Sequence, residues 1–232
     1  MSTTSASNVS VAVIGAGVAG LTAAEALRQQ GVQVKVFERF PALADSRATK
    51  NGAFGISING TACLDALGYY KELEACLTAV HKYTTLEGTG SDLVDLGSTD
   101  FTSLLRTYKY GQNCISRSAC IEVLARPLLD AHCVHFNKHV ERVEEQDSAI
   151  TVFFADGSSE NFDLVIGADG VNSAVRRSIA PGLSKDSAFT NLCSFFGSIP
   201  DEDEFDHPLL SLNQLLRVYA VDITMITYAV ET

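Results

Sequence analysis

The sequence predicts an α/β fold that begins with a βαβ unit and continues in a mostly parallel sheet. Two observations support this fold class. An apolar, β-branched run at residues 11–14 leads directly into glycines and a helical pattern, and a second apolar run at 164–166 again ends in glycine. Short apolar runs bounded by turn residues are typical of strands buried on both faces of a parallel sheet.

The composition is that of a globular protein without a nucleic-acid partner. Of the 232 residues, 46% are hydrophobic and 19% charged, which is typical of a packed domain. The formal net charge is −11 and no basic run occurs. Since basic residues supply much of the affinity for phosphate backbones, binding to nucleic acid is not expected.

The first βαβ unit is predicted over residues 11–38. The run at 11–14 predicts a strand, and residues 18–30 predict a helix that Gly31 ends. Val34 and Val36 alternate with polar neighbours and predict a second strand, which ends at Glu38.

The middle of the chain is expected to alternate between short strands and helices. We predict a Gly- and Ser-containing loop at 42–55 and a short strand at 55–58. Two helices are predicted at 60–67 and 70–80, followed by an irregular stretch of strands and loops at 81–114. A further helix is predicted over 118–131 from its apolar spacing, and Pro127 is expected to disturb its last turns.

Strand patterns dominate from His132 onward. An Asp156-Gly157 turn between alternating runs predicts a hairpin, and residues 164–166 predict another buried strand. After Pro181 the segments 192–199 and 215–230 have strand composition, without a pattern that indicates how they close a sheet.

The N-terminal residues and the cysteines indicate a cellular location. Residues 1–10 lack the features of a signal or transit peptide and are interpreted as a flexible tail. The apolar run 11–27 contains Glu25 and three glycines and is too short for a membrane span. The six cysteines are scattered without a C-x-x-C pair, as in reduced intracellular proteins. We therefore expect a soluble cytoplasmic protein without a membrane span, and the sequence sets no oligomeric state.

The first glycine cluster predicts a Rossmann-type nucleotide site. In G-x-G-x-x-G, Gly15 permits the tight turn after the strand, Gly17 lets a pyrophosphate approach the backbone, and Gly20 lets the helix pack closely. The N–H groups at the helix start then face an anion. The candidate cofactor-binding residues here are Gly15, Ala16, Gly17, Val18, Ala19 and Gly20.

An acidic residue at the end of the next strand completes this motif. Glu38 follows Gly15 by 23 positions, close to the ~20 expected for a carboxylate that accepts hydrogen bonds from ribose hydroxyls. Its charge would repel a 2′-phosphate, so the bound nucleotide is expected to lack one. Arg39 is a further candidate beside it. To this point NAD and FAD fit equally well.

The second glycine segment distinguishes the two cofactors. DLVIGADGVNSAVRRSI, residues 163–179, resembles the second signature of the FAD-dependent aromatic-ring hydroxylases, the monooxygenases related to p-hydroxybenzoate and salicylate hydroxylases. The matched positions of G-A-D-G-x-x-S-x-x-R are Gly167, Ala168, Asp169, Gly170, Ser173 and Arg176. The resemblance implies that Asp169 and Gly170 lie beside the FAD pyrophosphate and that the segment also serves the nicotinamide coenzyme. Arg176 is either an anchor of this segment or a ligand.

Smaller matches extend the resemblance over residues 11–180. Arg47 corresponds to a flavin-contacting arginine, and Arg117 in ISRSACIEVL to the arginine that reaches the FAD phosphates and ribityl chain. Gln112 either joins Arg117 or is an ordinary loop residue. Val140 matches a position where the backbone of the family meets the adenine.

The resemblance implies the domain organisation. Residues 11–182 are expected to form a Rossmann-type FAD-binding domain, with a βαβ unit, a mostly parallel sheet and inserted strands and loops. Residues 183–232 are expected to begin a β-rich substrate domain. The third signature of the family, a G-D-A segment, is absent from the sequence, so the chain is interpreted as C-terminally truncated.

The resemblance also implies the function. NADH or NADPH reduces the FAD, and one atom of O₂ hydroxylates a small organic, aromatic substrate. Because the cofactor carries this chemistry, no catalytic side chain is named. Two alternatives remain open: a truncated member that binds FAD poorly and is inactive, and a related flavin reductase or epoxidase.

Two other kinds of site are not expected. His132, Cys133, His135 and His139 lie on a predicted strand, whose alternate side chains point to opposite faces, so a metal site is not predicted. Ser173 lacks the G-x-S-x-G elbow of a hydrolase nucleophile.

Overall fold

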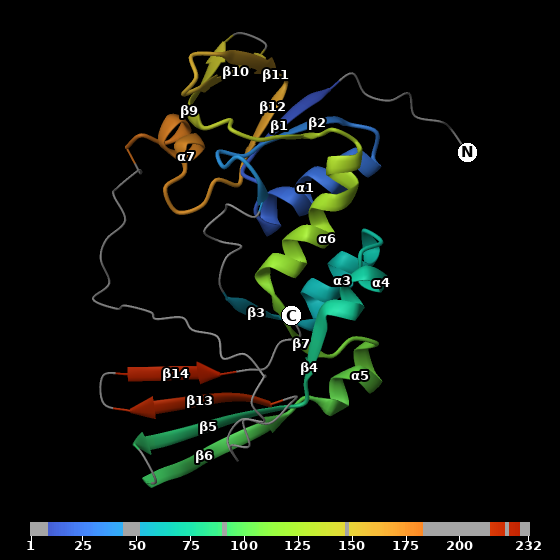
Figure 1. The fold of residues 1–232 in the computed structure, drawn as a ribbon, viewed down its shortest axis with the longest axis vertical. Coiled ribbons are helices and arrows are strands. Elements are labelled where there is room, and N and C mark those ends of the chain that lie inside the picture. Colours follow the sequence, from blue (N-terminus) through green and yellow to red (C-terminus); the bar gives the residue numbers. More distant parts are fainter. Residues whose placement is uncertain are drawn as a thin grey trace. The chain divides into compact units, whose positions relative to one another are not determined.

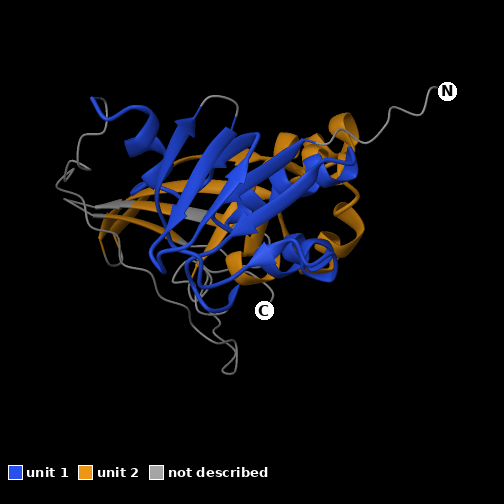
Figure 2. Ribbon diagram, turned by 90° about the horizontal axis from the view of Figure 1, so that it is seen from above, with its two compact units in different colours: residues 1–50, 121–196 blue, residues 51–120, 197–232 orange. Residues whose placement is uncertain are grey.

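The computed structural model describes residues 9–43, 52–89, 92–146, 149–182, 214–220 and 223–227. The chain divides into two compact units, shown in different colours in Figure 2. The first unit comprises residues 1–50 and 121–196, and the second comprises residues 51–120 and 197–232. Among the described residues, no helix is both long and apolar enough to cross a membrane.

The first unit contains a four-stranded parallel sheet, whose strands β12, β1 and β2 are labelled in Figure 1. Its strands, in spatial order, are β12 (Leu164–Gly167), β1 (Ser10–Ile14), β2 (Gln33–Phe37) and β8 (Val134–His135). Helix α1 (Val18–Gln29) connects β1 to β2, and Gly31 follows with a φ of 79°. The predicted βαβ unit is therefore confirmed.

The two central strands of this sheet form its core, whereas the edge strand does not. Val11, Ala12, Val13 and Ile14 of β1 are all buried. In β12, Leu164 is 46% exposed and no residue is fully buried. The prediction of a buried strand at 164–166 is correct for the strand and wrong for its burial, because β12 has β1 as its sheet partner on one side only in the described part of the sheet.

A second, antiparallel sheet packs into the same core. It consists of β9 (Val140–Gln146), β10 (Ala149–Phe154) and β11 (Ser159–Phe162). The predicted hairpin is confirmed, with Gly157 at a φ of 81° in the turn between β10 and β11. The ring of Phe37 lies 4.8 Å from that of Phe154, centroid to centroid, which joins the two sheets.

Two further helices belong to this part of the chain. Helix α6 (Arg117–Asp130) begins in the second unit and continues in the first, and α7 (Ala174–Ile179) follows β12. Helix α6 runs past Pro127, and the N–H of Ala131 donates to Pro127 O at 3.1 Å. The proline therefore does not end the helix, which continues to Asp130, although Pro127 has no N–H to donate within it.

The second unit begins with a three-stranded antiparallel sheet. Its strands are β3 (Ala53–Ile56), β7 (Gln112–Ser116) and β4 (Leu77–Val80), and its helical segments are α3 (Ile58–Ala66), α4 (Tyr70–Leu73), η2 (Glu74–Cys76) and α5 (Thr102–Tyr108). The strand predicted at 55–58 is found as β3, which begins two residues earlier, at Ala53. The predicted helix at 70–80 is wrong beyond η2, because Leu77–Val80 pairs with β7 as a strand.

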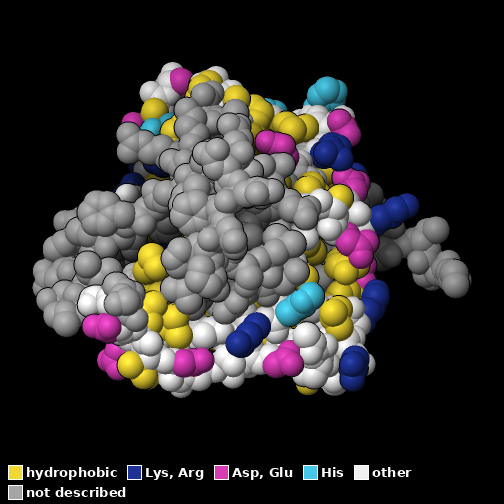
Figure 3. Space-filling model, turned by 60° about the horizontal axis from the view of Figure 1, so that its bottom comes forward, with side chains coloured by type: hydrophobic (Ala, Val, Ile, Leu, Met, Phe, Trp, Pro, Cys, Tyr) yellow, Lys and Arg dark blue, Asp and Glu magenta, His cyan; other side chains and the backbone are white. Residues whose placement is uncertain are grey.

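A four-stranded sheet completes the second unit. It has the order β14 (Ile223–Thr227), β13 (Gln214–Ala220), β5 (Lys82–Thr89) and β6 (Asp92–Asp100). Strand β13 is parallel to β5 and antiparallel to β14, which settles how these late strands pair. The predicted strand at 192–199 lies outside the described residues. On the face drawn in Figure 3, the visible Lys and Arg side chains lie singly among acidic and hydrophobic ones.

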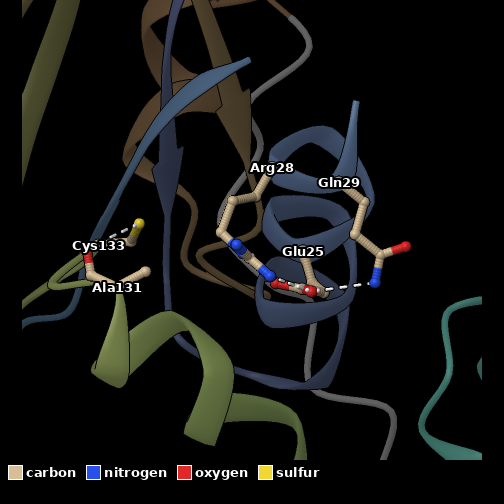
Figure 4. A network of polar contacts seen from close by, with 5 residues as sticks. All are labelled: Glu25, Arg28, Gln29, Ala131 and Cys133. Atoms are coloured by element: carbon tan, nitrogen blue, oxygen red, sulfur yellow. Dashed lines mark hydrogen bonds and ion pairs between the residues drawn. The ribbon is translucent and has the colours of Figure 1, made fainter. Parts of the chain in front are cut away.

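A partly buried ion pair lies on α1, away from its glycine-rich start. Glu25 is 2% exposed and accepts hydrogen bonds from Arg28 Nε at 2.7 Å, Arg28 Nη2 at 2.8 Å and Gln29 Nε2 at 3.0 Å. Figure 4 shows both side chains folded onto the Glu25 carboxylate, with Cys133 nearby after α6. The guanidinium of Arg28 lowers the pKa of Glu25 below its ordinary value of 4.5, and burial raises the pKa of the Cys133 thiol.

We expect Glu25→Gln to destabilise the protein in a pH-dependent manner. Because the pKa of Glu25 is lowered on folding, its ionised form stabilises the native state above pH 4.5, and this contribution is lost as the pH falls through the lowered pKa. Arg28 is 37% exposed and can be rehydrated, so we expect a loss of about 1–2 kcal/mol at pH 7, less than for a fully buried pair. Urea unfolding of both proteins at pH 7 and pH 3 measures the difference, which should shrink at pH 3. An equal difference in the free energy of unfolding at both pH values would contradict a stabilising role of the ionised Glu25 carboxylate.

Candidate cofactor-binding site

The two glycine segments meet at the carboxyl ends of neighbouring strands. Strands β1 and β12 pair in parallel with Ile14 opposite Gly167, and Ala168 N–H donates to Ile14 O at 2.9 Å. Gly15 has a φ of 102°, and a Cβ on it would lie 2.6 Å from Ala168 O. The structure thus brings together the two segments that the sequence singles out, at the position where open α/β sheets bind nucleotides.

Gly20 and Gly17 have opposite surroundings. A Cβ on Gly20 would lie 1.9 Å from Gly15 O and 3.3 Å from Ala168 Cβ, so this glycine allows close packing of α1 on the loop. Around Gly17, nothing lies within 4 Å of such a Cβ. Within the described residues, no side chain caps the start of α1, and its first turn contains no acidic residue. An open approach to a helix N-terminus suits an anion.

The remaining candidate residues of this segment are Ala16, Val18 and Ala19. Val18 and Ala19 are the first two residues of α1; Val18 is half-buried and Ala19 is exposed. Ala16 is buried, and its N–H donates to Glu38 Oε2 at 2.9 Å. The loop conformation is therefore tied to the acidic residue at the end of β2.

Glu38 is 8% exposed and lies beside the loop that joins β1 to α1, through its bond to Ala16. Its second oxygen, Oε1, accepts the N–H of Phe40 at 3.1 Å. An ionised carboxylate has about four acceptor positions, so both oxygens can still accept hydroxyl donors. Arg39 is exposed, with its guanidinium carbon 4.8 Å from the centre of the Phe40 ring.

We expect Glu38→Gln to weaken FAD binding about tenfold, because a hydrogen bond to a charged acceptor contributes about 1.5–3 kcal/mol. The amide also places an N–H₂ group against one of the two backbone donors. Titration of flavin fluorescence measures the dissociation constant. Glu160→Gln, which removes an exposed carboxylate paired with Lys35, is the control and should bind FAD as the wild type does. An unchanged affinity in Glu38→Gln would contradict the ribose assignment.

The residues just before Val140 are hydrogen-bonded to the backbone around Glu38. Lys138 N–H donates to Glu38 O at 2.9 Å and Asn137 N–H to Phe40 O at 3.1 Å, which holds residues 137–140 alongside 38–40. The side chain of Val140 is 4% exposed and belongs to the core cluster of the first unit. A contact between its backbone and an adenine stays a prediction.

Asp169 and Gly170 are arranged around the start of α7. The Asp169 carboxylate accepts hydrogen bonds from Ser173 Oγ at 2.6 Å, Ala174 N–H at 2.6 Å and Val175 N–H at 3.3 Å. Gly170 has a φ of 77° and open space around its Cα. Arg176 Nη2 donates to Val171 O at 2.5 Å, so Arg176 anchors the segment, which was one of its two predicted roles.

The other residues predicted to contact the cofactor lie in the second unit or outside the described residues. Arg117 begins α6 in the second unit, and its buried Nε has no hydrogen-bond partner among the described residues. Gln112 begins β7, also in the second unit. Arg47 lies outside the described residues. The roles of these three side chains stay predictions.

The structure shows contacts that the sequence did not predict. The N–H groups of Ala16 and Phe40 hold the Glu38 carboxylate, and the hydroxyl of Ser173 binds Asp169. Of these contacts, the sequence indicates only that of Ser173, because a serine just before a helical pattern is typical of an N-cap. The described residues contain no group of three or more His, Cys, Asp or Glu side chains that could hold a metal ion, and His135 instead stacks on Phe37 at 5.4 Å.

These residues fit a dinucleotide such as FAD. The space beside Gly17 would be filled by a Cβ and is left open, which suits a diphosphate close to the backbone. The Glu38 carboxylate lies at the end of the adjacent strand with acceptor capacity for ribose hydroxyls.

Similar proteins are flavin-dependent monooxygenases. The chain is 36% identical over 172 residues to a 3-amino-4-hydroxybenzoate 2-monooxygenase of Streptomyces cremeus, a match that covers 74% of this chain and 42% of the relative. It is 32% identical over 167 residues to an FAD-dependent monooxygenase of Emericella nidulans, covering 72% of this chain and 33% of that protein. The chain thus spans less than half the length of these curated relatives.

Solved structures agree with the fold. The structure of Klebsiella pneumoniae HpxO complexed with FAD and uric acid matches with a TM-score of 0.65 and 28% identity, over 75% of this chain and 42% of that one. The 2,6-dihydroxypyridine-3-hydroxylase of Arthrobacter nicotinovorans matches with a TM-score of 0.73 over 97% of this chain and 52% of that one. At 20% identity, this second match supports the fold alone.

The family comparison covers most of the chain. The family described as "FAD binding domain" matches residues 8–203, a range that includes both glycine segments and Glu38. The chain therefore belongs to the FAD binding domain family, as its glycine segments predict.

Proposed function

We propose that this chain binds FAD through residues 15–20, Glu38 and residues 167–170, as the cofactor-binding part of a monooxygenase. The observation that carries the proposal is the meeting of the two glycine segments at the ends of β1 and β12, with open space at Gly17. The reaction we propose uses NADH or NADPH and O₂ to hydroxylate a small organic substrate. The names of the relatives, such as 3-amino-4-hydroxybenzoate 2-monooxygenase, favour an aromatic one.

The proposed roles of the residues are binding and orientation. FAD supplies the redox chemistry when bound. The N–H groups at the start of α1 face the diphosphate, Gly17 leaves room for it, and Glu38 accepts the ribose hydroxyls. Arg39, Arg47, Arg117 and Val140 are proposed as further cofactor contacts, on the resemblance alone for Arg47 and on its position next to Glu38 for Arg39.

The domain assignment and location are parts of the same proposal. We assign residues 11–182 to FAD binding and residues 183–232 to the beginning of a substrate domain, and we place the protein in the cytoplasm. Strands β5 and β6, within the first of these ranges, share a sheet with β13 and β14 from the second. The substrate-domain sheet would then include strands inserted into the FAD-binding sequence.

The experiment that tests the proposal is reconstitution with FAD. The purified chain is incubated with excess FAD and desalted, and its visible spectrum is recorded. We expect flavin absorption at near-stoichiometric occupancy and loss of that absorption when NADH or NADPH is added without oxygen. A folded chain that stays colourless after reconstitution would contradict FAD binding, and bound FAD that neither coenzyme reduces would contradict the monooxygenase assignment.

A further inference from the structure

The main chain of Glu38 is held on both sides by one short segment at the end of β8. The N–H of Glu38 donates to His135 O at 2.9 Å, and Glu38 O accepts the N–H of Lys138 at 2.9 Å. Two residues after Glu38, Phe40 O accepts the N–H of Asn137 at 3.1 Å. Asn137 has a φ of 57°, a left-handed conformation that single asparagines adopt in turns. The position of Glu38 therefore depends on the position of this segment.

The side chain of Lys138 joins the segment to the turn between β10 and β11. Its Nζ donates to Asp156 Oδ2 at 2.6 Å and to Ser158 Oγ at 2.9 Å, and it lies 4.8 Å from the centre of the Phe154 ring. An ammonium group has three donors, so two of them are used in these bonds while the charge faces an aromatic ring. The ammonium group of Lys138 is thus bound by the protein itself.

The turn that binds Lys138 has hydrogen bonds of its own. Asp156 Oδ1 accepts the N–H and the hydroxyl of Ser158, at 2.9 and 2.5 Å. The N–H of Ala155 donates to His139 O at 2.9 Å, which adds a backbone bond between the turn and the residue after Lys138. The ammonium group of Lys138 lowers the pKa of the Asp156 carboxyl below its ordinary value of 3.8. At neutral pH the turn therefore offers an ionised carboxylate in a fixed position.

We infer that Lys138 is a positioning residue for the nucleotide site: its side chain anchors residues 135–138 to the turn at 155–158 and so sets the position of the Glu38 carboxylate. This inference rests on the proposed function, because it concerns the binding of the FAD ribose by Glu38. It assigns to Lys138 a part in FAD affinity without a contact to FAD. It also predicts that Lys138 acts through Glu38.

Replacement of Lys138 by methionine tests the inference in the full chain. Lys138→Met removes the ammonium group and keeps a long, unbranched side chain. Titration of flavin fluorescence should show a rise of about fivefold in the FAD dissociation constant, the size expected for a change that does not touch the ligand. ADP, which carries the same adenosine diphosphate as FAD, should lose about the same factor as a competitor, because both contain the ribose. A loss for FAD with an unchanged affinity for ADP would overturn the inference.

A double-mutant cycle with Glu38→Gln tests whether Lys138 acts through Glu38. In the Glu38→Gln background the carboxylate is already gone, so its position no longer matters. We expect the double variant to bind FAD within about twofold of Glu38→Gln, since residues that act as one unit are not additive. A further loss as large as that of Lys138→Met alone would show that the two residues act independently and would overturn the inference.

Lys35→Met is the matched control, because Lys35 also forms an ion pair with the β10–β11 hairpin. Its Nζ lies 2.6 Å from Glu160 Oε2 on β11, the same distance as between Lys138 and Asp156. The side chain of Lys35 is 46% exposed, against 26% for Lys138. We expect Lys35→Met to bind FAD as the wild type does. An equal loss of FAD affinity in this control would reduce the effect of Lys138 to the general loss of an ion pair and overturn the inference.

Amide hydrogen exchange without FAD supplies a second readout. We expect the N–H groups of Asn137 and Lys138 to exchange about tenfold faster in Lys138→Met, because the segment loses its anchor, and at the wild-type rate in Lys35→Met. Unchanged exchange in Lys138→Met overturns the inference. If the wild type does not bind FAD, the proposed function fails, and the exchange rates still decide whether the side chain of Lys138 holds this segment.

Discussion

Replacement of Gly20 by alanine is expected to destabilise the protein by about 3 kcal/mol or more, a large part of the stability of an ordinary domain. In a helix, alanine is favoured over glycine by about 1 kcal/mol, so without neighbours the change would stabilise the protein. The added Cβ, however, would lie 1.9 Å from Gly15 O, a backbone atom that cannot rotate away. The clash therefore determines the sign of the effect.

Gly60→Ala is a matched control for this prediction. Both glycines are the third residue of their helix, α1 for Gly20 and α3 for Gly60. A Cβ on Gly60 meets only Ile56 Cγ2, at 3.3 Å, so we expect a change within about 1 kcal/mol. Urea unfolding of the two variants and the wild type measures the difference, and equal stabilities for both variants would contradict the close packing of α1 on the loop.

The βαβ unit was predicted from the sequence because its signals are local. The glycines, the apolar run at 11–14 and the spacing of Leu21 and Ala24 are all read within a few residues of each element. In the structure, residues 11–14, Leu21 and Ala24 are buried in the core of one unit. Local preference and tertiary packing therefore favour the same elements, which is when pattern reasoning succeeds.

Three other elements show where local patterns are insufficient. Leu77–Val80 was assigned to a helix, and its pairing with β7, whose residues lie more than 30 positions later, makes it a strand. Helix α5 was missed because nearly all its residues are exposed, which leaves no apolar stripe. The pairing of β13 with β5 joins segments separated by more than 100 residues, and such a pairing has no local signal.

The candidate site was predicted in outline and not in its contacts. Spacing was sufficient to select the first glycine segment and Glu38, because these positions are fixed by the course of the backbone. The second glycine segment was selected by its resemblance to the family's second signature. The contacts of Glu38 with Ala16 and Phe40, and of Asp169 with α7, depend on side chains that fold back onto neighbouring backbone. Many residues could supply such N–H groups, so only the tertiary structure identifies the ones that do.

Gly17→Ala is expected to weaken FAD binding about 100-fold and to leave the apo protein folded, since one charge-assisted hydrogen bond contributes about 1.5–3 kcal/mol and each 1.4 kcal/mol is a factor of ten. Gly17 has a φ of −82°, which alanine adopts without strain, and its Cβ would meet nothing within 4 Å. The methyl group would instead occupy the space through which the diphosphate reaches the N–H groups at the start of α1. The apo stability should change by no more than about 1 kcal/mol, the difference between glycine and alanine as an N-cap.

Gly182→Ala is the control for Gly17→Ala, because it also replaces a glycine whose Cβ position has no neighbouring atoms. Its Cβ would also meet nothing within 4 Å, and it lies outside both glycine segments, so we expect the affinity and stability of the wild type. Fluorescence titration and urea unfolding of the three proteins give the two quantities independently. Because Gly20→Ala is expected to weaken the fold and Gly17→Ala only the binding of FAD, the pair separates the two tasks of the motif. If Gly17→Ala bound FAD as tightly as the wild type, the diphosphate could not lie at the start of α1.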